Sequence, residues 1–232
     1  MFCKDLLAID DKSFFKHLRL SKAAFNYLLN LLDLEEESGR GKQRISATEC
    51  LMLTLWFLGN KTSFRETAAQ FALSISAVHR IIYNTVNKIC ELCDAIIKWP
   101  TDLKTTEQNF KEVSGFPGIA GAIDATHIKV RPPQEHQKDY LDRTMNHSEV
   151  LLAVCDENMK YTHVSTSFPG SIHDQRCLDL SLQLSTAITS PPNAFFPRHE
   201  YHLAGDSGFK LQSTVLVPYK DYGNLSVQKK QL

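Results

Sequence analysis

Three aspartates in the carboxyl half of the chain, Asp124, Asp174 and Asp206, stand in settings that suit metal chemistry. Converging carboxylates make an oxygen-rich site that fits Mg²⁺ or Mn²⁺. Two such ions can activate an attacking water and stabilise the leaving oxygen when a phosphodiester is cut. We therefore predict that these aspartates form a divalent-metal site that cuts or rejoins nucleic acid.

Each aspartate also has a purely structural interpretation. Asp124 interrupts a run of apolar and small residues, where an ionised carboxylate is costly unless a cation or a base such as Lys129 or Arg131 compensates it. Asp174 stands near the start of a predicted helix, where the helix dipole favours a negative cap. Asp206 follows an apolar strand and could close a turn. Because ligand sites gather at strand ends in α/β sheets, the three together favour a site.

The segments that carry these aspartates read as strands and one helix. A helical pattern covers residues 173–188. Runs rich in β-branched and aromatic residues indicate strands over 118–130, 149–156, 160–167, 200–208 and 213–219. Three strands that can pair antiparallel, followed by a helix and further strands, predict an α/β domain with a mixed sheet.

The amino-terminal region has a different period. Residues 1–112 read as all-α, and the α/β domain is predicted to cover 118–232. Apolar residues recur at helical spacing over 21–34 and 47–59, and Gly59 suits the end of the second helix.

A helix-turn-helix is predicted at about residues 62–90. Thr62 or Ser63 can cap its first helix, and Ser76 can cap its second. In such a motif the start of the second helix faces base edges, which here means Ser74, Ser76, Ala77, His79 and Arg80. We take Ser76, His79 and Arg80 as the candidate DNA-binding residues. A plain helical hairpin fits the same local pattern, so both interpretations stay open.

Composition sets limits on partners. The chain has 26 basic and 26 acidic residues, so any surface for nucleic acid must be local. The loop with Arg40, Lys42 and Arg44 could supply phosphate contacts. The longest apolar stretch, residues 51–58, is too short for a bilayer span of about 20 residues, and no membrane partner is expected.

The six cysteines lie in apolar surroundings and are expected to be reduced and buried in an intracellular protein. Cys90 and Cys93 form a single CxxC. Zinc normally needs a second pair of ligands, and no matching pair stands nearby in the sequence. The CxxC therefore predicts structural cysteines rather than a zinc site.

Three motifs resemble those of the PIF/Harbinger transposases and the nucleases derived from them. They are GAIDATHI at 121–128, PGSIHDQRCL at 169–178 and LAGDSGF at 203–209, with YLDRTMNHS and VCDENMKYTHV fitting the segments between them. The resemblance covers about residues 118–220. It implies an RNase H-like fold, acidic metal ligands and DNA strand cleavage.

Carried over by position, the resemblance makes Asp124, Asp174 and Asp206 catalytic and metal-ligand candidates. Strand topology favours Asp206 as the second essential carboxylate, whereas motif spacing favours Asp174, so all three are kept. The neighbouring histidines and arginines, His127, His173, Arg143 and Arg176, are candidates to orient a carboxylate or contact phosphate.

The sequence departs from the family pattern in three respects. A glutamate expected on a late helix would fall beyond Leu232, so the domain is expected to be incomplete at its carboxyl end. Thr144 stands where the family favours lysine, and Val150 where it favours asparagine. Loss of a ligand would weaken metal affinity and the chemistry that depends on it.

The most concrete expectation is a nuclear, transposase-derived DNA endonuclease that depends on Mg²⁺ or Mn²⁺ and uses a metal-activated water. A catalytically inactive DNA-binding or partner-binding protein that keeps the transposase fold is the alternative. A metal phosphohydrolase for small phosphates is a third idea, which leaves the helix-turn-helix unexplained. The expected partner is DNA, with room for a separate DNA-binding partner protein and for an oligomer.

Overall fold

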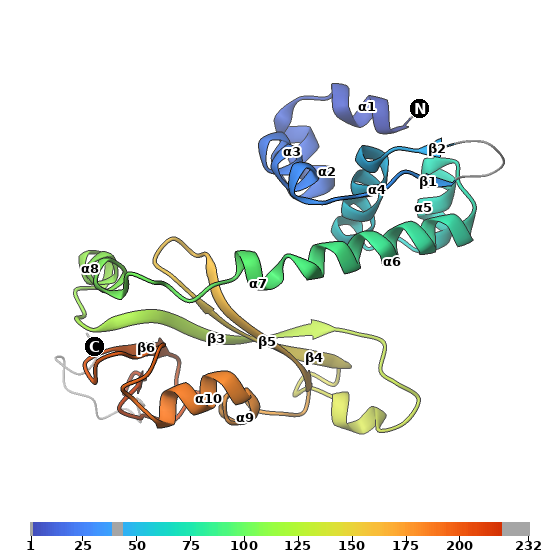
Figure 1. Ribbon diagram of the computed structural model, residues 1–232. Helices are drawn as coiled ribbons and strands as arrows, with labels where there is room; N and C mark the ends of the chain where they lie inside the picture. The colour runs from blue at the N-terminus through green and yellow to red at the C-terminus, as the bar shows by residue number, and fades with distance from the viewer. Residues whose placement is uncertain (1, 39–43, 220–232) are drawn as a thin grey trace. The chain divides into compact units, whose positions relative to one another are not determined.

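The computed structural model describes residues 2–38 and 44–219, and the chain divides into two compact units, Met1–Ile96 and Ile97–Leu232 (Figure 1). The division falls earlier than the predicted break between residues 112 and 118. The reason is that helix α8 (Leu103–Ser114) packs against strand β3 (Ile119–Lys129) of the second unit. Each unit is described by itself.

The first unit is helical, as predicted. Its elements are α1 (Phe2–Ala8), α2 (Asp11–Leu18), α3 (Lys22–Leu31), β1 (Glu37–Ser38), β2 (Arg44–Ile45), α4 (Ala47–Asn60), α5 (Phe64–Phe71), α6 (Ile75–Glu91) and α7 (Cys93–Ile96). The capping residues explain where several helices begin. Ser46 and Ser63 each form a capping box with a glutamate three residues later, which satisfies two backbone donors at each helix start.

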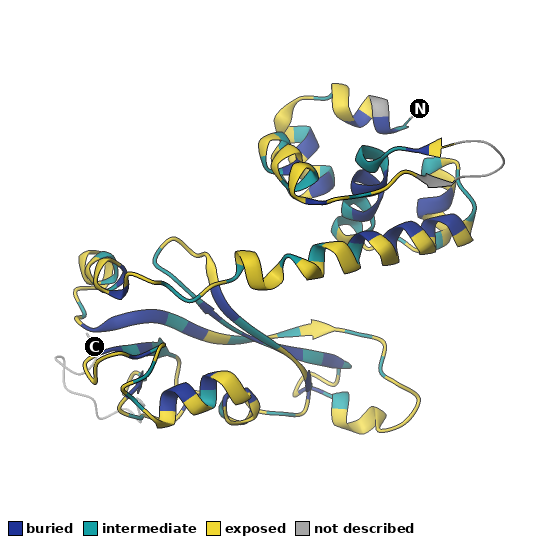
Figure 2. Ribbon diagram, viewed as in Figure 1, coloured by how far each residue is buried: buried dark blue, intermediate teal, exposed yellow. Residues whose placement is uncertain are grey.

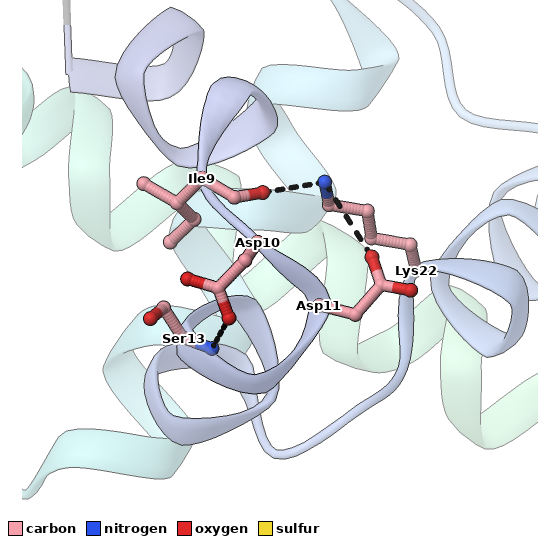
Figure 3. A network of polar contacts seen from close by, with 5 residues as sticks. All are labelled: Ile9, Asp10, Asp11, Ser13 and Lys22. Atoms are coloured by element: carbon pink, nitrogen blue, oxygen red, sulfur yellow. Dashed lines mark hydrogen bonds and ion pairs between the residues drawn. The ribbon is translucent and has the colours of Figure 1, made fainter.

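Polar contacts hold the connections between the first three helices (Figure 3). The Asp10 side chain accepts from the Ser13 backbone N–H at 3.0 Å and so caps α2. The Lys22 ammonium donates to the Ile9 carbonyl at 2.6 Å and lies 3.6 Å from the Asp11 carboxylate. Because Lys22 opens α3, it ties the start of that helix to the α1–α2 connection.

Helix α4 is the centre of the first unit. Five consecutive residues, Cys50 to Thr54, are buried, which explains why this helix is apolar nearly all round (Figure 2). Leu51 and Met52 pack with α2 and α3, whereas Leu53 packs with Val78 and Ile81 of α6.

Two predicted helix boundaries are wrong. Helix α4 continues past Gly59 to Asn60, and its C-cap is Lys61, which has φ of 50°. The Asn60 side-chain amide donates to the Trp56 carbonyl at 2.8 Å in this last turn. Helix α6 is capped by Ser74, whose side chain accepts from a backbone N–H. Ser76 lies inside the first turn instead.

The second unit is built on a five-stranded mixed sheet, which confirms the predicted α/β class. Its order is β5-β4-β3-β6-β7, with β3, β4 and β5 antiparallel to one another in turn and β6 and β7 parallel to β3. The further elements are β4 (Ser148–Cys155), β5 (Tyr161–Pro169), β6 (His202–Gly205), β7 (Val215–Leu216), the 3₁₀ turn η1 (Gln137–Tyr140), α9 (Asp174–Leu180) and α10 (Leu182–Thr189). Figure 1 shows α8 and the pair α9–α10 on opposite sides of this sheet.

The predicted helix over 173–188 is interrupted. Ser181, with φ of −72° and ψ of 86°, separates α9 from α10. Its buried hydroxyl lies 2.7 Å from the Ser165 hydroxyl on β5. A serine that bonds across to the sheet favours a break, because it offers the backbone an alternative to the helix.

The cysteines differ in part from the expectation. Cys3, Cys50 and Cys177 are buried and Cys155 is half-buried, whereas Cys90 and Cys93 are exposed, and all six are free thiols. Cys90 and Cys93 lie where α6 ends and α7 begins, with their side chains exposed to solvent. Their apolar neighbours in the sequence had predicted burial. Among the described residues no helix is long and apolar enough to cross a membrane.

We predict that two glycines before β3 differ sharply in their tolerance of a side chain. Gly115 and Gly118 have similar positive φ angles, 76° and 79°, which strain any L-residue by about 1–2 kcal/mol. A Cβ at Gly115 would meet nothing within 4 Å, whereas one at Gly118 would collide with the Glu200 carbonyl oxygen. Gly115→Ala should therefore cost only the backbone strain, and Gly118→Ala about 1–3 kcal/mol more, by chemical denaturation. Equal losses for the two variants would contradict this packing.

Candidate active site

The pairing of β3 with β6 brings two of the predicted aspartates to one place. The strands are parallel, with Ile123 opposite Gly205. Asp124 and Asp206 directly follow these two residues in the sequence. Segments far apart in the sequence therefore deliver two carboxylates to neighbouring positions at the end of β6.

The side chain of Asp124 is exposed. Asp124 pairs with Ala153, and its neighbours Ile123 and Ala125 belong to the hydrophobic core. Because side chains alternate along a strand, Asp124 lies on the opposite face, where it is exposed. The strand is mostly buried before Asp124, but Asp124 itself is exposed, so the predicted cost of burying its charge does not arise.

Asp206 is held in a tight turn after β6. Its Oδ1 accepts from the Gly208 backbone N–H at 2.9 Å, which confirms the turn-closing interpretation. The turn is anchored by Phe209, which is buried in the core. A further hydrogen bond, 2.7 Å from the Lys210 backbone N–H to Gln175 Oε1, ties the turn to α9.

Asp174 is the first residue of α9 rather than its cap. The N-cap position is His173, whose side chain makes no capping hydrogen bond. Asp174 is half-buried, and a carboxylate in the first turn of a helix is favoured by the helix dipole. The Gln175 bond to the Asp206 turn therefore holds this carboxylate close to the end of β6.

Gly208 lies between two of the carboxylates. A Cβ built on this residue would be 2.5 Å from Asp174 Oδ2 and 3.0 Å from Asp206 Oδ1. Since both oxygens lie at those distances from one point, they are at most 5.5 Å apart. The missing side chain is what allows the two carboxylates to converge.

The charges around Asp174 show which other side chains are near. Burial raises the pKa of Asp174, and the negative charges of Asp206 and Asp124 raise it further. Arg143 and His127 act in the opposite direction. All three predicted aspartates thus belong to one electrostatic neighbourhood, with one arginine and one histidine at its border.

A loop between β3 and β4 carries Arg143 to this neighbourhood, and Asp142 organises it. Asp142 Oδ1 accepts from the Thr144 backbone N–H at 2.8 Å, the Thr144 hydroxyl at 2.7 Å and the Asn146 backbone N–H at 3.0 Å. These donors lower the pKa of Asp142 to about 2. The backbone of Ser171 also bonds to Asp139, which docks the loop beside the start of α9.

Sequence reasoning missed Asp142 and Ser148. Ser148 is fully buried, donates from its hydroxyl to Asp142 Oδ2 at 3.2 Å, and lies 3.0 Å from His127 Nδ1. The signal available was the run DRTMNHS, because an aspartate followed by short polar residues is typical of a side chain that bonds its own loop.

Other predicted residues are not brought to the carboxylates. His173 and Arg176 are exposed on or beside α9, and neither is among the main causes of the pKa shift of Asp174. Within residues 2–38 and 44–219, no three His, Cys, Asp or Glu side chains form a ready-made metal cluster. The closely placed ligand candidates are Asp174 and Asp206, with Asp124 on the neighbouring strand.

The candidate DNA-binding residues lie in the first unit. Helices α5 and α6 are joined by residues 72–74, and Ser76, His79 and Arg80 are exposed on α6. The His79 ring lies 5.2 Å from that of Phe64 and 6.4 Å from that of Tyr83.

Two details of the DNA-binding expectation change. Ala77 is buried, because it faces the core of its own unit, and it cannot contact bases. Arg44 is exposed and its guanidinium lies 3.3 Å from the Glu36 carboxylate. Arg40 and Lys42 lie outside the described residues.

Comparison with known proteins links both units to families. Residues 123–232 match the family model described as DDE superfamily endonuclease, and residues 1–91 match a domain of unknown function (DUF8040). The chain is 27% identical over 226 residues to "Protein ALP1-like" of Arabidopsis thaliana, covering 91% of this chain and 56% of that protein. It is 27% identical over 196 residues to "Putative nuclease HARBI1" of Rattus norvegicus, and 25% identical over the same length to the protein of that name from Homo sapiens; in both cases 83% of this chain and 54% of the relative are covered.

The chain therefore spans about half the length of the curated relatives it matches. No solved structure matches it.

We predict that Asp206→Asn lowers the pKa of Asp174. The charge of Asp206 is the largest contribution after burial, so its removal should move the carboxyl of Asp174 toward its ordinary range without reaching it. The measurement is a carboxylate-detected NMR titration of the two proteins. Asp94→Asn, which removes an exposed carboxylate from α7 in the other unit, is the matched control. An Asp174 titration that is the same in wild type and Asp206→Asn would contradict the convergence of the two side chains.

Proposed function

We propose that this chain, whose residues 123–232 form a domain of the DDE superfamily endonucleases, is a transposase-derived nuclease that cuts DNA with the help of a divalent metal ion. The observation that carries the proposal is the convergence of Asp174 and Asp206 around Gly208. It is supported by relatives whose name is that of a nuclease. An RNase H-like arrangement of the sheet is part of the same proposal.

The residues present fit Mg²⁺ or Mn²⁺. All the donors are carboxylate oxygens, which are the ligands that these hard cations prefer. Negative charge is already in excess, since Asp206 and Asp124 raise the pKa of Asp174, and a cation would relieve that repulsion. Asp174 and Asp206 would hold the metal, with Asp124 as the ligand candidate from β3.

The chain's own residues would orient the DNA. Arg143 is exposed beside the carboxylates, and a guanidinium suits bidentate contact with a phosphate. The metal would supply Lewis-acid activation of the phosphodiester and of an attacking water. The turn that carries Asp206, pinned by buried Phe209, would keep the ligand positions fixed during the reaction.

The first unit would hold DNA. Its α5–α6 pair has the spacing of a helix-turn-helix, and Ser76, His79 and Arg80 are exposed near the start of the second helix. DNA as substrate makes the nucleus the proposed location. A separate DNA-binding partner protein and an oligomer remain part of the proposal.

A second candidate function rests on a specific observation. Asp124 is exposed on the face of β3 opposite Ile123 and Ala125, and the described residues hold no preformed three-ligand cluster. A chain with an incomplete ligand set would bind DNA or a partner without cutting. The two candidates differ in whether the chain cuts DNA when a divalent metal is supplied.

The nuclease proposal predicts metal-dependent nicking of supercoiled plasmid. Nicking should appear with Mg²⁺ or Mn²⁺ and disappear with a chelator. Asp206→Asn and Asp174→Asn should each lower the rate by at least about 100-fold, because loss of a ligand costs more than loss of its supporting partners.

Asp94→Asn is the control, since it removes an exposed carboxylate from α7, in the other unit, and leaves the contacts of Gln175 unchanged. Absence of nicking by the wild-type protein, or equal nicking by all variants, would favour the non-cutting function.

We also predict that Arg80→Ala weakens binding to duplex DNA by about tenfold and reduces the slope of log affinity against log salt by about one, because one phosphate or base contact is lost. Fluorescence anisotropy over a salt series measures both quantities. Lys88→Ala is the control, because Lys88 is exposed on the same helix about two turns further along and is paired with Glu91 at 3.2 Å. An equal effect of the two variants would refute the assignment of the start of α6 as the reading surface.

A further inference from the structure

Three side chains from β3, β4 and the loop between them form a continuous hydrogen-bond chain: Asp142, Ser148 and His127. We propose that Asp142 and Ser148 are positioning residues that hold His127 as the tautomer protonated on Nδ1, so that its Nε2 can accept a proton from the attacking water. The second half of this inference rests on the proposed nuclease function. The first half does not.

The direction of the chain follows from counting hydrogens. A serine hydroxyl has one hydrogen to donate. Ser148 donates it to Asp142 Oδ2 at 3.2 Å, because an ionised carboxylate can only accept. Toward His127 the hydroxyl can therefore only accept, and the contact of 3.0 Å requires a hydrogen on Nδ1. A neutral imidazole with Nδ1–H carries its lone pair on Nε2.

The first link of the chain is well fixed. Asp142 stays ionised over the whole neutral range, because four hydrogen bonds to its two oxygens hold its pKa at about 2. Three of these bonds occupy Oδ1, and Ser148 supplies the one to Oδ2. Oδ1 of Asp142 therefore accepts only from residues of its own loop, and Oδ2 accepts from Ser148.

The second link has little freedom to turn. Ser148 is fully buried, and Gly170 approaches it so closely that a Cβ on Gly170 would collide with the hydroxyl oxygen. The same Cβ would lie 2.6 Å from the Tyr140 carbonyl. The hydroxyl is enclosed by backbone, and its hydrogen-bond partners are set by the fold.

The third link, His127, interacts electrostatically with Asp174. His127 pairs with Val150 on the core-facing side of β3 and is half-buried, and its charge acts on Asp174. No described residue makes a hydrogen bond to its Nε2. Nε2, the ring nitrogen that does not contact Ser148, is therefore the one that can accept a proton.

An acceptor in this position has a defined use in phosphodiester hydrolysis. The water oxygen forms a new bond to phosphorus while the bridging phosphorus–oxygen bond breaks. One proton of the water passes to His127 Nε2, and the leaving oxygen takes a proton from solvent. Asp142, ionised and bonded through Ser148, would stabilise the charged imidazole that results, as a carboxylate does behind a general base.

The test is the tautomer of His127, read from ¹⁵N–¹H long-range NMR correlations at pH 8 and assigned with His127→Gln. We expect the wild-type ring to be protonated on Nδ1. In Asp142→Asn the amide should donate to Ser148, since its oxygen is claimed by the three donors at Oδ1. Ser148 must then donate to Nδ1, and the ring should switch to the Nε2–H form.

Two further variants sharpen the test. Ser148→Ala should leave the ring as a mixture of tautomers, because neither form keeps its partner. Ser165→Ala alters a similar contact, 3.2 Å to His163 Nε2 on β5, and should leave His127 unchanged. A wild-type His127 in the Nε2–H form, or no change in Asp142→Asn, would overturn the proposed chain.

Activity separates the two halves of the inference. If the chain cuts DNA, Asp142→Asn should lower kcat by about 10- to 100-fold with KM for plasmid little changed. The predicted tautomers without any nicking by wild type would retain the hydrogen-bond chain and reject the nuclease. Normal kcat in an Asp142→Asn protein whose ring has switched would reject the role of His127 as proton acceptor.

Discussion

Strand β3 is paired on both edges, and the arrangement of the candidate site depends on these two registers. The parallel register with β6 brings Asp124 beside Asp206. The antiparallel register with β4 brings His127 beside Ser148. A shift of one residue in either register would reverse the faces of these side chains, because the side-chain period of a strand is two. The apolar residues of β3 and β4 that would be exposed by such a shift are what keep the registers in place.

Like charges are held close together at this site, at some expense to stability. Asp174 is half-buried and lies near two other carboxylates, which is unfavourable unless a cation or a proton relieves it. The surrounding fold compensates with rigid supports: Phe209 in the core, the backbone bond from Lys210 to Gln175, and the loop organised by Asp142. Strain concentrated where ligands bind and offset elsewhere is a common property of functional sites.

Features that depend on local sequence pattern could be predicted from the sequence. Features that depend on which strands pair, and on hydrogen bonds between distant segments, could not. The strands, the order of the motifs and the importance of the three aspartates could be read from apolar runs and spacing. The exposed face of Asp124 could not, because it depends on which residues of β4 lie opposite. The break at Ser181 and the roles of Asp142 and Ser148 were also hidden, since each comes from a hydrogen bond to a distant segment. Asp174 and Asp206 approach each other at Gly208 because the turn after β6 lies beside the start of α9. No short sequence motif predicts that contact.

The burial of Phe209 has a consequence for the motions of the site. The turn at residues 206–209 cannot open without pulling this ring out of the core and breaking the backbone bond to Gln175. Surface turns usually exchange their amide hydrogens through small local openings. Here the amide of Phe209, bonded to the Asp206 carbonyl at 3.3 Å, belongs to the buried residue itself and should exchange only when its ring leaves the core. The backbone that carries the Asp206 carboxylate therefore opens together with the core of the sheet rather than as a separate surface loop.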